Sequence, residues 1–396
     1  MWSAIILTLW LLLLSRTSQQ AGENVHAFQA LRLNFSAATS SIDEDDYTGK
    51  DDDETVPDSV LYLYMSSLTS KDYANETNAV LGADKQSWAA IKTELKAKKD
   101  DNGTNRYPLA PDGPAKSAAK LTLEKIHNES TALKNNMQSI KSEIKAATKE
   151  AGETLSTAAY GGKQLKEVPK EQFAGRSTTC SGSAPLTQPG VSIGHDMICI
   201  CSGGKDGSNI CGNNVGTTTY DGAQSTPATI QGLFEALRNA YAKWSASTKT
   251  TAARITATLR AFEETLRQRT AVGGAHSMKL RNGNAADCNG AGSSATCVDY
   301  TTVLGGNKLD EINLVKQMQT ATEQLQRASS RRAALESARA EMKQKKTAAW
   351  TAEGLLKLTI PVPPNPTTQP PHAAQATKEE DCNKDQSSDK CKDLCK

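Results

Sequence analysis

The stretch from Ala119 to Ala151 constrains the fold of this chain more than any other. Small and apolar side chains recur there at alternating intervals of four and three residues, at Ala119, Leu123, Ile126, Leu133, Met137, Ile140, Ile144, Ala147 and Ala151, with one polar lapse at Ser130. Such a heptad seam is typical of an amphipathic helix whose apolar stripe packs against another helix. At about 1.5 Å per residue, the seam alone would be on the order of 50 Å long. The sequence therefore predicts a long helix that needs partners.

Two further long helices are predicted, over residues 229–269 and 308–352, each with its own apolar seam. In the first, two intervals of four follow each other at Leu233-Leu237-Tyr241 and at Trp244-Thr248-Ala252, which are stutters in the heptad pattern. The second has lapses at Arg332 and Arg339. Aromatic residues make up only 5% of the chain, which favours slender helix-on-helix packing over a thick globular core. The predicted fold is dominated by α-helix: an elongated antiparallel coiled coil or helical bundle that carries loop-rich, disulfide-stapled lobes.

Shorter elements are also predicted. Residues 26–33 and 87–99 have helical patterns, whereas the apolar run at 60–68 fits either a strand or a buried helix. Two insertions rich in Gly, Ser, Thr and Asn separate the three long helices. If neighbouring helices run antiparallel, the insertions lie at opposite ends. If one helix is broken or folds back, both lie at one end, and the sequence leaves this open.

The chain divides into four segments by composition. An apolar run from Ala4 to Leu14 predicts a secretory signal peptide over residues 1–21. A helical amino-terminal domain is predicted for residues 22–360, and a stiff Pro-rich linker for residues 361–375. Residues 376–396 are charged and carry three cysteines, which we interpret as the start of a truncated Cys-rich carboxy-terminal domain.

Cysteines in a secreted chain predict disulfides rather than a zinc site. The expected disulfide residues are Cys180, Cys199, Cys201, Cys211, Cys288 and Cys297. Cys199 and Cys201, two apart on an expected extended strand, would point to one face and so reach Cys180 and Cys211 rather than each other. Which cysteine pairs with which stays open. Cys288 and Cys297 are close enough in sequence to close a small loop together.

Other chemistry finds little support in the sequence. The formal net charge is +2, which gives no case for binding nucleic acid. Asp43, Asp45 and Glu54 have the spacing of calcium-loop ligands, but Tyr47 and Gly49 occupy the wrong positions, so a solvated surface loop is favoured. No catalytic constellation, metal-ligand spacing or cofactor fingerprint is present. We therefore expect neither an enzyme nor a cofactor.

Four glycosylation sequons are present, at Asn34, Asn75, Asn102 and Asn128, whereas Asn365 is excluded by the proline that follows it. Asn102 is the strongest candidate because it lies in a loop flanked by Gly and Pro. Asn128 would have to project from the solvent side of the first long helix while Ser130 lies on its seam. Asn34 falls near a helix that we expect to be packed.

The chain resembles the trypanosome variant surface glycoproteins along its whole length. The resemblance rests on the signal followed by the helix HAFQAL, the long Ala-rich heptad helices, and the block from Asp196 to Cys201 with Cys211 ten residues on. That CxC block is similar to the B-type amino-terminal domain. The Pro-rich hinge before Cys382, Cys391 and Cys395 is similar to the start of the family's carboxy-terminal domain.

The resemblance implies a homodimeric coat protein, held on the plasma membrane by a glycosylphosphatidylinositol anchor that these residues do not contain. Its implied role is antigenic variation and immune evasion by steric shielding, with host antibodies as partners. By position in the loop from Cys288 to Cys297, Ser293 and Ser294 are candidates for the O-linked sugar found in some members. Two alternatives stay open: a receptor for a host serum ligand on the same scaffold, and an incomplete gene product.

Overall fold

The computed structural model describes residues 24–49, 56–75, 84–203, 210–212, 215, 220, 227–242, 249–267, 278–281, 288–290, 296–304 and 308–356. These residues are mostly helical, and their one sheet pairs two short antiparallel strands, β1 (Lys279–Leu280) and β2 (Val298–Asp299). The predicted all-α fold class is therefore confirmed. None of the described helices combines the length and the apolar character needed to cross a membrane. The signal, linker and carboxy-terminal segments predicted from composition lie outside the described residues.

The chain divides into two compact units. Unit 1 comprises residues 1–62 and 124–349, and unit 2 comprises residues 63–123 and 350–396. Two long helices contribute to both, α7 (Pro114–Tyr160) and α12 (Asn313–Leu356). The helix that carries the seam, expected from about Ala115 to about Ala151, is thus present and extends further at its carboxy-terminal end.

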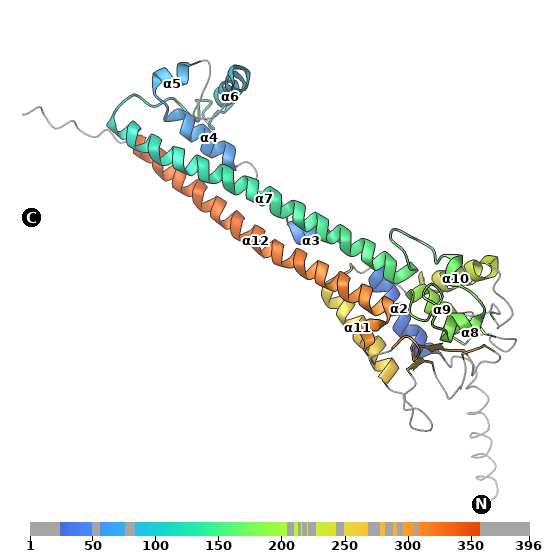
Figure 1. The fold of residues 1–396 in the computed structure, drawn as a ribbon. Coiled ribbons are helices and arrows are strands. Elements are labelled where there is room, and N and C mark those ends of the chain that lie inside the picture. Colours follow the sequence, from blue (N-terminus) through green and yellow to red (C-terminus); the bar gives the residue numbers. More distant parts are fainter. Residues whose placement is uncertain are drawn as a thin grey trace, which may run out of the picture. The chain divides into compact units, whose positions relative to one another are not determined.

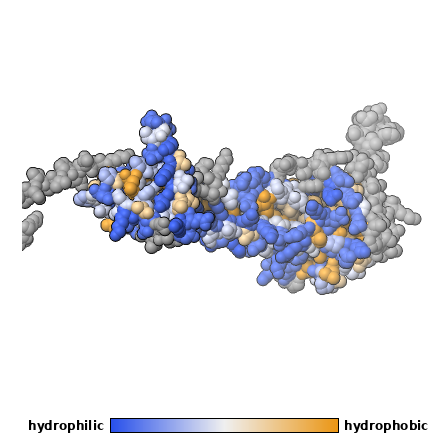
Figure 2. Space-filling view, turned by 90° about the horizontal axis from the view of Figure 1, so that it is seen from above, coloured by the Kyte–Doolittle hydropathy of each residue, from blue (hydrophilic) through white to orange (hydrophobic). Residues whose placement is uncertain are grey.

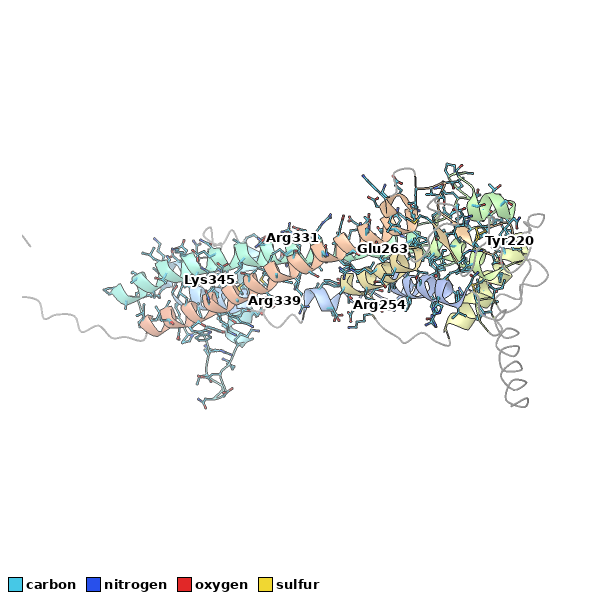
Figure 3. The ribbon with its side chains drawn as sticks, turned by 90° about the horizontal axis from the view of Figure 1, so that it is seen from below. Tyr220, Arg254, Glu263, Arg331, Arg339 and Lys345 are labelled. Atoms are coloured by element: carbon cyan, nitrogen blue, oxygen red, sulfur yellow. A yellow bond between two sulfur atoms is a disulfide. The ribbon has the colours of Figure 1, made fainter. Side chains whose placement is uncertain are left out.

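Within unit 1, α7 and α12 lie side by side and antiparallel (Figure 1). Two ion pairs show the register: Glu129 lies 2.5 Å from Lys345, and Glu143 lies 2.6 Å from Arg331. A step of fourteen residues forward on α7 is matched by a step of fourteen backward on α12. Arg331 and Lys345 are both visible along α12 in Figure 3. In this unit, the helix that packs against the apolar seam of α7 is therefore α12.

Burial follows the seam on both helices. Of the residues predicted to form it, Leu123, Ile126, Met137, Ile140 and Ile144 are buried, and Leu133 is only half-buried. The polar lapse at Ser130 is fully buried. On α12 the predicted seam is buried throughout, at Leu314, Met318, Ala321, Leu325, Ala328, Leu335 and Met342.

The second predicted long helix is wrong as a single element. The structure has α10 (Pro227–Ala242) and α11 (Ala252–Arg267), and the chain is not helical at residues 249–251. Thr250 donates hydrogen bonds to two carbonyls at the end of another helix, and Thr251 accepts one from the backbone of Arg254 as a helix cap. Ser and Thr crowd residues 245–251, and their hydroxyls favour caps over helix interiors. Trp244 and Thr248, part of the expected seam, lie outside the described residues.

Because that helix is broken, both insertions meet in one lobe at the end of unit 1 where α7 stops and α12 starts (Figure 1). The lobe contains α2 (Val25–Thr39), α8 (Arg176–Ser181), α9 (Ile193–Cys201), α10, α11 and the two strands. Helix α2 is longer than the predicted 26–33 and packs on both α9 and α11. The Asn24 side chain donates to the carbonyls of Ile200 (2.8 Å) and Thr296 (2.7 Å), which belong to different insertions. The second of the two arrangements left open by the sequence is therefore the one found.

Unit 2 contains short helices as well as one end each of α7 and α12. The ambiguous run at 60–68 is largely helical, in α4 (Val56–Ser66), which crosses into the unit, and α5 (Ser70–Ala74) and α6 (Lys85–Ala97) follow. Trp88 is fully buried, meets the edge of Tyr73, and donates from Nε1 to the carbonyl of Asn75. The remaining short elements among the described residues are α3 (Asp45–Thr48) and the 3-10 turns η1 (Lys170–Gln172) and η3 (Leu309–Glu311). In Figure 2 hydrophilic residues cover much of the visible face, and hydrophobic ones form small separate groups.

The disulfide-linked lobe as candidate functional surface

Helix α9 carries two disulfides into the centre of the lobe. Cys199 bonds Cys180 and Cys201 bonds Cys211, so each reaches a different partner. The expected extended strand is wrong, because both cysteines lie in a helix. Residues two apart on an α-helix point about 200° away from each other, so the two sulfurs leave α9 in different directions. In the second insertion Cys288 bonds Cys297, as their spacing predicts.

The sequence around α9 explains its position. Ser192 caps the helix by accepting from the backbone of His195, and every residue of α9 is buried. A Cβ at Gly194 would come within 2.5 Å of Val168 and 2.8 Å of Phe234. Glycine therefore allows α9 to approach its neighbours at a distance that any side chain would prevent.

His195 and Asp196 of α9 form a buried polar network with Tyr300, which follows β2. The Nδ1 atom of His195 lies 2.9 Å from one carboxylate oxygen of Asp196, and the Tyr300 hydroxyl donates to the other at 2.6 Å. The backbone of Gly190 also donates to Asp196 (2.9 Å), and the imidazole stacks on Phe173. Burial, and then the Asp196 charge, raises the pKa of Tyr300 well above its ordinary value. Because all three side chains are fully buried, the network holds segments together and has no access to a substrate.

Arg176 is fully buried and forms a second polar network in the lobe. No pattern in the sequence singles it out. Its guanidinium donates to the carbonyl of Cys199, to Ser202 (3.0 Å) and to the carbonyl of Tyr220 (2.9 Å), and it lies over the Tyr220 ring. A Cβ at Gly290 would come within 2.4 Å of the arginine side chain. Arg176 thus ties together parts of the first insertion and packs closely against Gly290 of the second. Tyr220 is visible at the lobe in Figure 3.

The acidic tract from Asp43 to Asp46 forms ion pairs with a lysine of the protein. Lys249 forms ion pairs with both Asp43 and Asp46, and Arg332 donates to the carbonyl of Asp46. No group of acidic, His or Cys side chains suited to a metal ion occurs among the described residues. Glu54 lies outside them. Of the residues that suggested a calcium loop, Asp43 therefore has an ammonium partner, and we call its ion pair with Lys249 the clasp.

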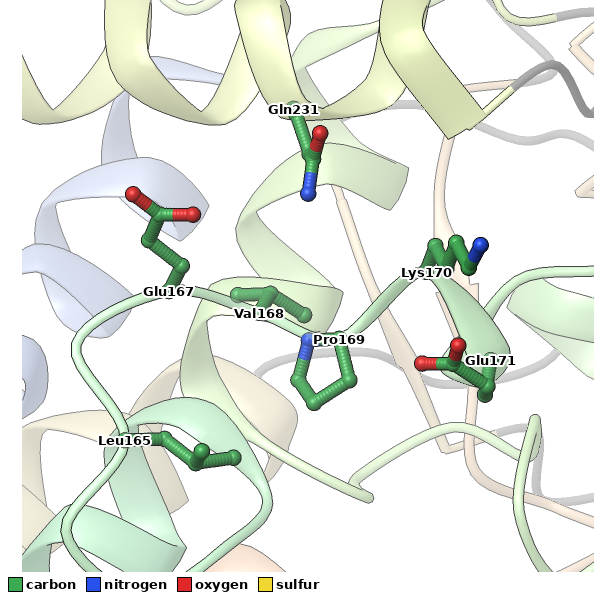
Figure 4. Close-up of a pocket in the computed structure, with 7 residues that line it drawn as sticks. All are labelled: Leu165, Glu167, Val168, Pro169, Lys170, Glu171 and Gln231. Carbon is green, nitrogen blue, oxygen red and sulfur yellow. The ribbon is translucent and has the colours of Figure 1, made fainter.

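A depression of the lobe lies beside η1. It encloses about 550 Å³ and is lined by Leu165, Glu167, Val168, Pro169, Lys170, Glu171 and Gln231 (Figure 4). Its charged side chains are exposed and of both signs. It lacks the buried, convergent polar groups that a small-molecule site requires.

The predicted sequons differ in their exposure to solvent. Asn34 is fully buried and its Nδ2 donates to the carbonyls of Ala30 and Thr258, so a glycan there is incompatible with the fold. Asn128 is exposed on α7, whereas Ser130 is fully buried. Asn75 and Asn102 are exposed outside helices. Ser293 and Ser294 lie outside the described residues.

Comparison with known proteins agrees with this architecture. A family model described as the trypanosomal VSG domain matches residues 6–344, which include the lobe and most of the paired helices. No curated protein matches the chain. Because the matched region covers well over half of the sequence, this chain belongs to the trypanosomal VSG domain family, whose members form the surface coat of trypanosomes.

Proposed function

We propose that this chain is a coat glycoprotein that shields the plasma membrane by steric exclusion and takes part in antigenic variation and immune evasion. The observation that carries the proposal is the family match through the lobe and the paired helices. The lobe supports it: disulfides and buried polar networks hold its scaffold, and sequence can vary in the exposed loops between them at little cost in stability. We expect host antibodies to bind these loops.

The buried position of the ionisable groups supports a non-enzymatic role. His195 and Asp196 are enclosed by packing, and the Arg176 guanidinium donates to two lobe carbonyls and a hydroxyl and lies over an aromatic ring. A catalytic group needs to touch its substrate. We expect shielding to depend on bulk and density alone, with no turnover and no cofactor.

Assembly and attachment form part of the same proposal. We propose a homodimer, and attachment to the outer leaflet through a glycosylphosphatidylinositol anchor. Phospholipase C specific for phosphatidylinositol should release the full-length protein from live cells. Retention after treatment would contradict the lipid anchor, and a monomer in sedimentation analysis of the released protein would contradict the dimer.

Surface abundance tests the coat function against the alternative of a serum-ligand receptor. A shielding coat has to be the dominant surface protein, whereas a receptor works at low copy number. Quantitative surface proteomics of cells that express this chain should therefore find it as the most abundant species. A low copy number, together with one stoichiometric host protein recovered from serum on the intact protein, would favour the receptor.

A further inference from the structure

We propose that Asn102 carries an N-linked glycan in the mature protein, that Asn34 carries none, and that Asn128 is occupied less than Asn102. The sequence ranks Asn102 first but leaves open which of the four sequons carry a glycan. Three of them, at Asn34, Asn102 and Asn128, have both of their chemically essential residues within the described structure.

The transfer reaction defines what a sequon has to present. The asparagine Nδ2 loses a proton and forms a bond to C1 of the oligosaccharide. The bond from C1 to the oxygen of a polyprenyl diphosphate donor breaks, and the diphosphate leaves. The hydroxyl two residues on takes part in acceptor recognition, so the amide and the hydroxyl have to be reached together.

Asn102 meets this requirement in a turn of unit 2. The turn lies inside an antiparallel bridge between Lys99 and Asn105, and Asn102 and Thr104 are both exposed. The Asp100 carboxylate accepts from the backbones of Asn102 (3.0 Å) and Thr104 (2.8 Å) and from the Thr104 hydroxyl. These bonds use the backbone nitrogen of Asn102 and leave its side-chain amide in solvent.

The turn also has room for a large modification. Gly103 has φ +76°, and a Cβ built on it would meet no heavy atom within 4 Å. The hydroxyl of Thr104 is bonded only at the surface, where water exchanges with such a bond at little net cost. The folded turn therefore tolerates a sugar on Asn102 without displacing any packed side chain.

The two helical sequons, at Asn34 and Asn128, present their acceptor groups poorly for a common reason. In an α-helix, residues two apart point about 200° away from each other, so the asparagine and the hydroxyl cannot face one side. For Asn34 both groups are also engaged: Nδ2 bonds the carbonyls of Ala30 and Thr258, and the Ser36 hydroxyl accepts from Arg254 (2.5 Å). For Asn128 the amide is exposed, but the hydroxyl of Ser130 is buried in the seam.

Site-resolved mapping of the full chain, secreted from eukaryotic cells, tests the proposal. Release by peptide N-glycosidase in heavy-oxygen water converts each formerly glycosylated Asn into labelled Asp, which mass spectrometry then locates. We expect the label at Asn102, none at Asn34, and less at Asn128 than at Asn102. An unlabelled Asn102, a labelled Asn34, or an Asn128 signal exceeding that of Asn102 would each overturn the proposal.

Matched variants distinguish the loss of the sequon from a disturbance of the folded turn. Asn102→Gln and Thr104→Ala should each lose the mass of one glycan, and Thr104→Ser, which keeps a hydroxyl, should retain it. Asn105→Gln makes the same chemical change three residues away, outside any sequon, and should leave the glycan in place. If a variant is not secreted, the labelling of the wild-type protein still tests which sequons are occupied. The result is independent of surface abundance, so it can fail while the coat function stands.

Discussion

The hydroxyl of Tyr300 donates a 2.6 Å hydrogen bond to Asp196 across 104 residues of sequence, and both side chains are fully buried. Tyr300 follows β2 in the second insertion, whereas Asp196 lies on α9 in the first. With the bonds from Asn24, this contact makes one lobe from two insertions that are far apart in the chain.

Tyr300→Phe should lower the free energy of unfolding by about 1–3 kcal/mol, because it leaves a buried carboxylate short of one donor. Urea denaturation followed by circular dichroism measures this. Tyr73 is half-buried, and its hydroxyl has no hydrogen bond within the described residues, so Tyr73→Phe should cost less than about 0.5 kcal/mol. Equal losses in the two variants would contradict the role given to the bond.

Ile144→Ala should destabilise unit 1 by about 2–5 kcal/mol, since it opens a cavity at a fully buried position of α7. Leu133→Ala should cost less, because Leu133 on the same helix is only half-buried. Thermal unfolding of both variants measures the difference. A Leu133→Ala variant as damaging as Ile144→Ala would show that the register between α7 and α12 is wrong.

Gly49→Ala should destabilise the protein more than Gly103→Ala. Both glycines have positive φ, +66° and +76°, where an L side chain costs about 1–2 kcal/mol. Only at Gly49 would the new Cβ also meet another group, Nη1 of Arg339 at 2.7 Å, and Arg339 is itself buried. Melting temperatures of the two variants provide the comparison. Equal shifts would mean that Arg339 moves aside freely.

Lys249→Gln should make the free energy of unfolding depend less steeply on pH in the acidic range. The hydrogen bond from Lys249, followed by that from the Asp45 backbone, holds the pKa of Asp43 below its ordinary value. Asp43 therefore binds its proton more readily in the unfolded chain, and its contribution is present above about pH 4 and lost as pH falls through the lowered pKa. Unfolding free energies measured from acid to neutral pH should fall less steeply for the variant than for the wild type.

Lys149→Gln is the matched control for that measurement. Lys149 is exposed on α7 and has no ion pair in the described structure. This variant should keep the acid slope of the wild type. An unchanged slope in Lys249→Gln as well would mean that the clasp between Lys249 and Asp43 contributes nothing in solution.

The helices that the sequence predicts well are those whose apolar residues repeat over many turns. Ile140 and Ile144 lie on a seam that continues for nine positions, and such a pattern is local and independent of topology. The boundary of α7 was missed by nine residues because its last turns, ending at Tyr160, are rich in Ala, Thr and Ser and carry a weak signal. The break before α11 was missed because the spacing stays at three or four through a region where Thr250 in fact bonds α2.

In the lobe, the sequence identified the cysteines but not the residues around which the lobe is organised. Cys288 and Cys297 were paired correctly because a short loop limits the alternatives. Arg176 was not noticed, since a lone arginine in a polar stretch is ordinarily a surface residue. Only the tertiary structure shows that Arg176 is fully buried and donates to the carbonyls of Cys199 and Tyr220.

The sequence by itself determined that this chain forms long paired helices, that its cysteines lie in two insertions, and which family it resembles, because periodicity, composition and spacing are properties of contiguous residues. Only the tertiary structure decided that both insertions join in one lobe, that Asn34 is buried whereas Asn102 is exposed, and that Lys249 closes the acidic tract. Each of these depends on contacts between residues tens to hundreds of positions apart, and the free energy of such contacts is set by burial and hydrogen-bond partners that no local pattern encodes.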